Sequence, residues 1–301
     1  MIYTEHKPVM IEEVLGLLDV KKGGLYIDAT VGAGGHTREI VARGGRVLGI
    51  DCSLKSLGVA RGNLRDLNDK VRLVQGNFAD IAKIASHTGF ESVDGILFDL
   101  GVASFQIEDP SMGLSFLKDG PLDMRLDKSL GVLASDLVNS LPKAQLKEMF
   151  WESGEKDGRE IAQRIVAARQ ESKIETTRAL KEIVENVKGR TLRRAQGKRS
   201  RIHPATKVFM ALRIAVNCEF ENLRKGLLQS VDLLRRGGRL VVISFHSGED
   251  RLVKDFLRAQ QSLDQVKILT KKPVLPNEQE ILANSRSRSA KMRAGERMER
   301  I

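Results

Sequence analysis

The chain has 301 residues, which is enough for one large domain with an insertion or for two domains. Apolar residues make up 41% of it, sufficient for a packed core, and no apolar run approaches the about 18–20 residues of a membrane span. The two cysteines form no CxxC pair and the five histidines are scattered, so we expect no disulfide framework, no metal site and a reducing, cytoplasmic setting.

The first hundred residues alternate short apolar runs with helical patterns. A glycine cluster and a helix that reaches Arg43 follow the first of these runs. Apolar strands separated by helix-length spacers predict βαβ units in a parallel sheet that is covered on both faces. The predicted strands are residues 25–29, 46–51, 71–75 and 95–100.

The alternation stops after the fourth strand. From about Asp109 to His203 the sequence is charged, helical and poor in strands. Within it, residues 143–152 follow Pro142 as one helix, Ile161 and Ile165 mark a second, and a third has an apolar stripe. The stripe consists of Leu180, Ile183, Val184 and Val187.

Strand character returns at residues 239–244, and weaker strands are expected at 266–269 and near 289–293. We therefore predict an α/β sheet domain, Rossmann-like, that is interrupted by a helical insertion. The expected sheet domain comprises residues 1–109 and 207–301, and the expected insertion is 110–206.

Positive charge is concentrated in one segment, residues 188–207. This segment holds eight basic and no acidic residues, and so supplies most of the net charge of +11. Concentrated positive charge favours a polyanionic partner, because each neutralised phosphate releases counterions. A solvated basic loop is the alternative interpretation.

The strongest local motif, Asp28-Ala-Thr30-Val-Gly-Ala-Gly34-Gly35-His36, follows the first strand and begins a helix. Glycine permits close approach of a ligand and unusual backbone angles. A nicotinamide-binding fingerprint would require a third glycine where Thr37 stands. The loop is closer to the D-x-G-x-G-x-G loop of class I methyltransferases, with Thr30 in place of the first glycine.

Two further positions fit an adenosine ligand. Asp51 ends the second strand, nineteen residues after Gly32, where a carboxylate accepts hydrogen bonds from ribose hydroxyls. Its alternative role is to cap the helix that follows. Phe78, after the third strand, is placed to pack on an adenine ring or simply to belong to the core.

The fourth strand closes with Asp99-Leu100, and Gln106 follows. Ligands of open α/β sheets bind beyond the carboxyl ends of the strands, so we expect Asp99 at the cleft. In amino-group methyltransferases, turns at this position accept the hydrogens of the substrate NH2 and direct the nitrogen lone pair at the methyl group. Asp99 with the Leu100 carbonyl is placed for that catalytic role, although the usual prolines are absent, and a contact with the cofactor is the alternative.

Several longer motifs extend the resemblance to nearly the whole chain. In order, they are Gly120-Pro-Leu-Asp-Met-Arg125, His203-Pro-Ala-Thr206, Ala211-Leu-Arg-Ile-Ala-Val-Asn217, Ile243-Ser-Phe-His-Ser247 and Ser285-Arg-Ser-Arg-Ser-Ala-Lys291. With them, the chain resembles the bacterial 16S ribosomal RNA cytosine-N4-methyltransferase family, which modifies a decoding-centre cytidine.

The resemblance implies a class I methyltransferase fold with an inserted helical domain, and S-adenosylmethionine as cofactor. The implied cofactor contacts are Gly34, Gly35, His36, Asp51, Phe78, Asp99 and Gln106. The sequence departs from the family pattern at Ala103, at Met112–Leu114 and at Gly248. None of these departures falls on an implied cofactor contact.

The expected partner is 16S ribosomal RNA, within the small ribosomal subunit, and the target cytosine must leave its stack to reach Asp99. The basic segment and the arginine-rich tail 286–297 are expected to hold phosphates, which position the RNA without identifying a base. The candidate RNA-binding residues are Lys198, Arg199, Arg201, His203 and His246, although a packed, hydrogen-bonded histidine is the commoner role for His246.

Three alternative functions are compatible with parts of this pattern. One is a methyltransferase for another nucleic-acid amine, such as adenine N6. A second is a non-catalytic, adenosine-binding RNA chaperone, which would not need Asp99. The third is a nicotinamide oxidoreductase, which Thr37 disfavours.

Overall fold

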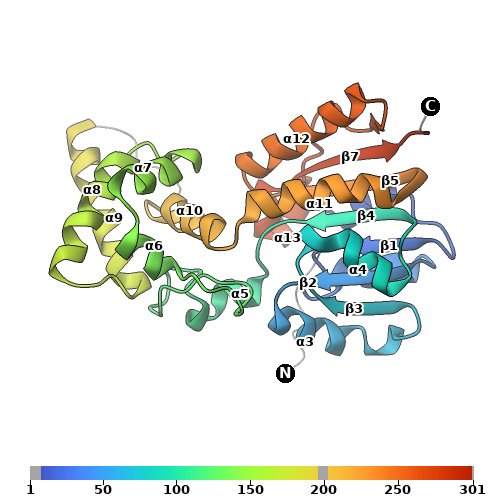
Figure 1. The fold of residues 1–301 in the computed structure, drawn as a ribbon, viewed down its shortest axis with the longest axis horizontal. Coiled ribbons are helices and arrows are strands. Elements are labelled where there is room, and N and C mark those ends of the chain that lie inside the picture. Colours follow the sequence, from blue (N-terminus) through green and yellow to red (C-terminus); the bar gives the residue numbers. More distant parts are fainter. Residues whose placement is uncertain (1–7, 196–202, 300–301) are drawn as a thin grey trace. The chain divides into compact units, whose positions relative to one another are not determined.

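A computed structural model describes residues 8–195 and 203–299 of the chain (Figure 1). The chain divides into two compact units, one formed by residues 1–103 and 220–301 and the other by residues 104–219. We call the first the sheet unit and the second the helical unit. None of the described helices is long and apolar enough to cross a membrane.

The sheet unit contains a seven-stranded sheet with strand order β3-β2-β1-β4-β5-β7-β6 (Figure 1). The first five strands are parallel, whereas β7 lies antiparallel between β5 and β6. The bounds are β1 Leu25–Asp28, β2 Arg46–Asp51, β3 Val71–Gln75, β4 Val93–Asp99, β5 Leu234–Ser244, β6 Val266–Ile268 and β7 Lys291–Arg297. All seven predicted strands are present, and the predicted α/β fold class is confirmed.

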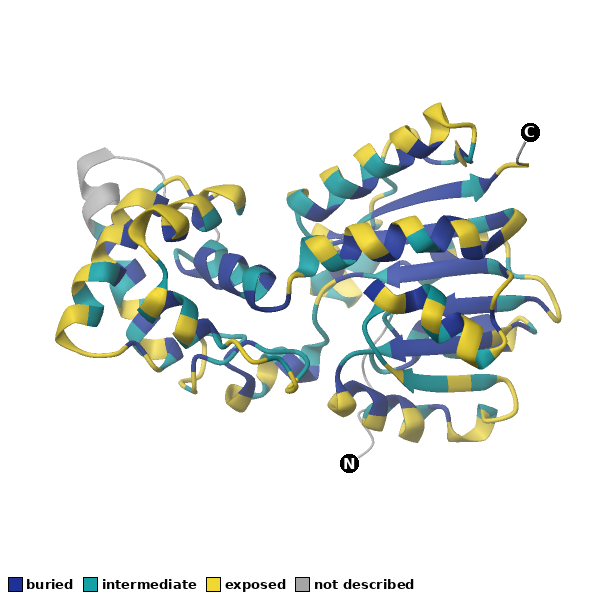
Figure 2. Cartoon of the chain, in the orientation of Figure 1, coloured by how far each residue is buried: buried dark blue, intermediate teal, exposed yellow. Residues whose placement is uncertain are grey.

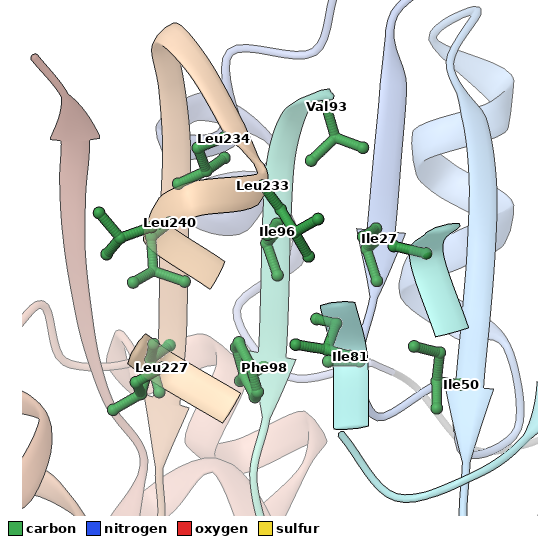
Figure 3. Close-up of a cluster of buried hydrophobic side chains, with 14 of the residues drawn as sticks. Ile27, Ile50, Ile81, Val93, Ile96, Phe98, Leu227, Leu233, Leu234 and Leu240 are labelled. Atoms are coloured by element: carbon green, nitrogen blue, oxygen red, sulfur yellow. The ribbon is translucent and has the colours of Figure 1, made fainter. Parts of the chain in front are cut away.

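Helices cover both faces of the sheet. Apolar side chains of α4 (Ile81–Thr88), α11 (Glu219–Leu233) and α12 (Ser247–Ser262) pack in one cluster with strand residues such as Ile96 and Phe98 (Figure 3). On the other face, α1 (Ile11–Leu18) and α2 (Gly35–Ala42) pack on a second cluster, next to α3 (Leu54–Asn63). Consequently the central strands are buried along most of their length (Figure 2).

Acidic residues stand at the carboxyl ends of three neighbouring strands. β1, β2 and β4 each consist mainly of buried apolar residues and each ends in an aspartate: Asp28, Asp51 and Asp99. Because these strands are parallel neighbours, their carboxyl ends lie on one edge of the sheet. This edge collects the carboxylates of residues far apart in sequence.

The helical unit is built from α5 (Ser104–Glu108), α6 (Ala134–Ser140), α7 (Lys143–Glu152), α8 (Gly158–Glu171), α9 (Thr177–Ala195) and α10 (Thr206–Val216). The predicted stripe of α9 is directed inward, since Leu180, Val184 and Val187 are buried in a common core with Phe150 of α7. Helix α7 has the bounds that the sequence predicted, with Pro142 as its N-cap residue.

Helix α10 belongs to the helical unit. The boundary expected at residues 206/207 placed this helix with the sheet, but Val208, Leu212 and Val216 are buried in the core of the helical unit. Beyond its last turn, the Asn217 side chain accepts a hydrogen bond from the Leu126 N–H at 2.8 Å and donates one to the Met124 carbonyl at 2.9 Å. An apolar helix alone does not reveal which of two cores it joins.

Other helices and turns connect these elements. The short helix α13 (Glu278–Ala283) precedes β7, and 3-10 turns lie at Arg65–Leu67, Phe78–Asp80, Pro110–Met112 and Ser285–Ser289. Glu280 of α13 accepts a hydrogen bond from the Met10 N–H at 2.6 Å. The C-terminal part of the sheet unit thereby holds the segment that leads into α1.

Candidate active site

The glycine loop joins β1 to α2 at the edge where the aspartates gather. Gly34 is the N-cap residue of α2 and has a left-handed backbone with φ 86°. The left-handed conformation favours glycine here, and a Cβ on Gly34 would lie 2.7 Å from Leu64 Cδ1, which would have to move. Gly35 and His36 begin α2, and N–H groups in the first turn of a helix have no acceptor within that helix. The loop therefore presents backbone donors beside the carboxyl edge of the sheet.

Asp51 connects this loop to the next helix. Its Oδ2 accepts a hydrogen bond from the Gly32 N–H at 3.0 Å, and its Oδ1 accepts one from the Ser53 N–H at 2.8 Å. Ser53, rather than Asp51, caps α3, through a bond from the Ser56 N–H to its Oγ. Burial raises the pKa of Asp51 to about 6 despite these bonds. The capping alternative for Asp51 is therefore wrong in its simple form, and a ribose contact stays a prediction.

Replacing Asp51 by alanine is expected to weaken S-adenosylmethionine binding by about 1–3 kcal/mol, the range for hydrogen bonds to a charged acceptor. Isothermal titration calorimetry measures this change directly. Asp69→Ala, at an exposed position of the same unit, is the matched control. Unchanged affinity in a folded Asp51→Ala protein would remove this carboxylate from the cofactor site.

Asp99 is held by its backbone and keeps one carboxylate oxygen unused. Its N–H donates to Thr30 Oγ1 at 2.6 Å, and Oδ2 lies 3.6 Å from Nδ1 of His36. The other oxygen, Oδ1, is buried and has no hydrogen-bond partner among the described residues. A buried, unsatisfied acceptor is costly, so such an atom indicates a place for a donor from a ligand.

Burial raises the pKa of Asp99 to about 6. His36 lowers this pKa, whereas Asp28 and Glu249 raise it. Since about 6 lies below physiological pH, the carboxyl is mainly ionised there and able to accept hydrogen bonds with both oxygens.

Asp28 and Thr30 are the functional residues that sequence reasoning did not assign. Asp28 accepts hydrogen bonds from the Thr30 N–H at 3.3 Å and from Thr37 Oγ1 at 2.8 Å. Burial raises the pKa of Asp28 as well. The signal was the threonine at the first glycine position of the loop: its hydroxyl supports the backbone of Asp99, which glycine cannot do.

Both ring nitrogens of His36 are directed at protein groups. Nε2 lies 2.9 Å from the Val9 carbonyl oxygen and Nδ1 faces Asp99. The cofactor contact that the resemblance implies for His36 is therefore expected through its backbone. A role for the side chain toward Asp99 was not predicted.

The two remaining predicted cofactor contacts lie in different units. Phe78 packs edge-to-face on Phe98, with ring centroids 5.5 Å apart, so it takes part in the core as the alternative interpretation expected. Gln106 is buried within α5 of the helical unit. Contacts of both side chains with the cofactor stay predictions.

The two histidines predicted to bind RNA pack and form hydrogen bonds with residues of the unit to which each belongs. His203 stacks on Phe116 with centroids 4.4 Å apart, accepts a hydrogen bond from the Ala205 N–H and lies 3.1 Å from Glu185 Oε1. His246 caps α12, accepting a long, 3.4 Å bond from the Glu249 N–H at Nδ1. The packed role expected as the commoner one for His246 is thus present, and contacts of both histidines with RNA stay predictions.

Lys198, Arg199 and Arg201 lie outside the described residues. At the ends of the same basic segment, Lys188 forms ion pairs with Glu155 and Asp157, and Lys207 donates to the Gly154 carbonyl at 2.6 Å. These two charges are neutralised or engaged within the helical unit. Fewer positive charges of residues 188–207 are therefore available to phosphates than the eight basic residues in the sequence suggest.

The arginine-rich tail differs from its predicted role. Arg293 and Arg297 are buried in β7, where Arg293 donates to Asp250 at 2.7 Å and Arg297 to Gln265 Oε1 at 3.0 Å. The prediction that the whole tail holds phosphates is wrong for these two residues. β7 pairs with β5 and β6 on its two edges and is buried on both faces over Met292–Gly295, so a count of arginines does not show which are exposed.

Two of the long motifs have structural roles within the helical unit. In the motif 120–125, the Asp123 carboxylate pairs with Arg125 and Lys128, and this hydrogen bonding lowers the pKa of Asp123 to about 2 although burial opposes it. The motif 211–217 ends in Asn217, whose amide bonds to Met124 and Leu126. Hydrogen bonds of Asn217 therefore connect the second motif to the end of the first.

The fold and the site together define an α/β methyltransferase: a parallel sheet with one antiparallel strand, a glycine loop after β1, and acidic residues ending β2 and β4. S-adenosylmethionine is its methyl donor. The chain belongs to the MraW methylase family, whose model matches residues 3–298.

Curated relatives match over nearly their full length. The chain is 46% identical to ribosomal RNA small subunit methyltransferase H of Thermomicrobium roseum, covering 98% of this chain and 94% of the relative. It is 44% identical to the protein of that name from Geotalea uraniireducens, covering 97% and 98%. A third such protein, from Carboxydothermus hydrogenoformans, is 41% identical over 97% and 98%.

Proposed function

We propose that this protein methylates the exocyclic N4 amine of a decoding-centre cytidine in 16S ribosomal RNA. The observation that carries the proposal is the buried, unsatisfied Oδ1 of Asp99 beside the glycine loop, an acceptor placed where an amine can donate. The relatives' name, ribosomal RNA small subunit methyltransferase, supports ribosomal RNA of the small subunit as the substrate.

The residues at the sheet edge fit S-adenosylmethionine. The left-handed Gly34 turns the chain into α2, the first turn of α2 offers backbone donors, and Asp51 at the end of β2 offers a carboxylate to ribose hydroxyls. Phe78 and Gln106 complete the proposed set. When bound, the cofactor supplies an electrophilic methyl group on a positively charged sulfur.

The task of the protein is to hold the amine in line with that methyl group. Asp99 Oδ1 and the Leu100 carbonyl would accept the two amine hydrogens, which takes the nitrogen lone pair out of conjugation with the ring. Held in this way by Asp99 and the Leu100 carbonyl, the nitrogen would be free to take the methyl group that the bound cofactor would supply, with the electrons of the broken carbon–sulfur bond remaining on sulfur. The methylated amine carries one extra proton, which ionised Asp99 is placed to accept. Alignment of the three atoms supplies most of the acceleration.

The RNA must deliver an unstacked base to this edge. The basic segment 188–207, through its residues other than Lys188 and Lys207, would position the RNA by its phosphates, while a pocket near Asp99 would select the base. We propose small-subunit RNA in the cytoplasm, within the ribosomal subunit, as the setting for this reaction.

The product tests the proposal. After incubation of purified protein with S-adenosylmethionine and either 16S RNA or small subunits from a strain lacking the gene, nucleoside mass spectrometry should find N4-methylcytidine. RNase mapping should place it in the decoding region. A product that is only N6-methyladenosine or only 5-methylcytidine would contradict the base assignment, and cofactor binding with no methylated product on either substrate would favour an RNA chaperone.

A further inference from the structure

The imidazole of His36 lies between a backbone carbonyl and the carboxylate of Asp99. Nε2 is 2.9 Å from the Val9 carbonyl oxygen, and Nδ1 is 3.6 Å from Asp99 Oδ2. A carbonyl oxygen only accepts hydrogen bonds, so Nε2 carries the hydrogen in this contact. Nδ1 is therefore the nitrogen left to interact with Asp99, which it faces.

His36 lies beside several buried acidic groups. Asp28 at the end of β1 and Glu249 of α12 are the other titratable groups that act on Asp99, and both raise its pKa. The oxygens of Asp28 accept bonds from Thr30 and Thr37, and Glu249 Oε2 accepts one from the Phe245 N–H at 2.8 Å. His36 also lowers the pKa of Asp28, and Glu249 lies 3.2 Å from the His246 ring. Asp99 differs from these two carboxylates in its buried Oδ1, which has no partner among the described residues.

We propose that His36 is a positioning residue for Asp99. Its ring, fixed by Val9 on one side, faces Oδ2 with Nδ1 and so orients the carboxylate, which leaves Oδ1 as the acceptor for the substrate amine. Since His36 also begins α2 behind Gly34 and Gly35, one residue connects the cofactor loop with the amine acceptor. This inference rests on the proposed function of Asp99 in amine methylation.

Nuclear magnetic resonance of the protein without RNA tests the pair directly. With ¹⁵N-labelled histidine, the His36 signals should show the hydrogen on Nε2, and Asp99→Asn should shift the Nδ1 signal. With ¹³C-labelled aspartate, the Asp99 carboxyl should titrate near pH 6 in the wild-type protein. In His36→Gln, which keeps an amide N–H for Val9 but no cation, this pKa should rise by about one unit, because the largest lowering influence is gone.

The pH profile of methylation provides the second test. Asp99 must be ionised to accept the amine, so kcat/KM should fall as pH drops through about 6 in the wild-type protein. A rise of about one unit lowers the ionised fraction about threefold at pH 6.5 and leaves it nearly unchanged at pH 8.5. His36→Gln should therefore lose activity mainly at the lower pH. His87→Gln, at an exposed position of α4, is the matched control and should keep the wild-type profile.

Several outcomes would overturn this inference. They are a His36 ring protonated at Nδ1 rather than Nε2, an Asp99 pKa that does not change in His36→Gln, or a loss of activity that is equal at all pH values. If His36→Gln does not fold, the ¹⁵N titrations of the wild-type and Asp99→Asn proteins decide alone. An incorrect base assignment would be seen in the nucleoside analysis, whereas the resonance experiments use no RNA, so the two failures are distinguishable.

Discussion

Asp99→Ala is expected to lower the single-turnover rate of methylation at saturating cofactor about 100- to 1,000-fold. Loss of one positioned hydrogen-bond group at a reacting centre costs about 2.7–4 kcal/mol in the transition state, by analogy with oxyanion holes. The affinity for S-adenosylmethionine, measured by calorimetry, should change far less than the rate. Full activity of this variant would contradict the role of the carboxylate as the amine acceptor.

Asp94→Asn is the matched control, because Asp94 lies on the same strand but near its other end, where it accepts hydrogen bonds from Leu25 and Arg235. Its methylation rate should stay close to that of the wild-type protein.

Asp99→Asn tests the effect of the ionised carboxylate on the stability of the protein. The folded pKa of about 6 lies above the usual 3.8, so ionised Asp99 opposes folding at neutral pH. The melting temperature of Asp99→Asn should therefore equal or exceed that of the wild type at pH 8, and any gain should vanish as pH falls below about 4.

Removing the helical unit is expected to abolish RNA methylation while S-adenosylmethionine binding stays measurable. The variant joins Ala103 to Phe220 through a flexible linker of about eight Gly and Ser residues. The sheet, the glycine loop and Asp51 all belong to the remaining unit, which has clusters of buried side chains on both faces of the sheet. Calorimetry measures the binding, and nucleoside mass spectrometry measures the methylation.

Circular dichroism must first show that the deletion variant is folded. The full chain carrying Lys143→Ala, an exposed change on α7, controls for an unspecific loss of activity. If the folded deletion variant methylated RNA at the normal rate, the proposed substrate surface on the helical unit would be wrong.

The sequence predicted the sheet well because its strands are short apolar runs with polar ends. β2 and β3 have the predicted bounds, and the edge that gathers Asp51 and Asp99 follows from parallel pairing alone. β5 begins at Leu234 rather than at the predicted Arg239, because Arg235 and Arg236 interrupt the apolar run. A prediction based on apolar runs therefore misses the charged residues with which this strand begins.

The site was less predictable, because its contacts depend on angles and distances. Spacing located Asp51, but not its bonds to Gly32 and Ser53. The inward direction of the His36 ring depends on Val9, which nothing in the sequence pattern connects with His36. Charge counting failed for Lys188 and Arg293, since a count does not distinguish a charge paired inside the protein from one facing solvent.

The position of the helical unit in the chain determines the order in which the protein can fold during its synthesis. β4 is made before the helical unit, but β5, its neighbour in the sheet, is made after it, and β7 is made last although it lies between β5 and β6. All helices of the helical unit have been synthesised once α10 leaves the ribosome. β4, in contrast, keeps an unpaired edge until β5 has been synthesised. The nascent half-sheet would therefore wait for β5 with the edge of β4 exposed.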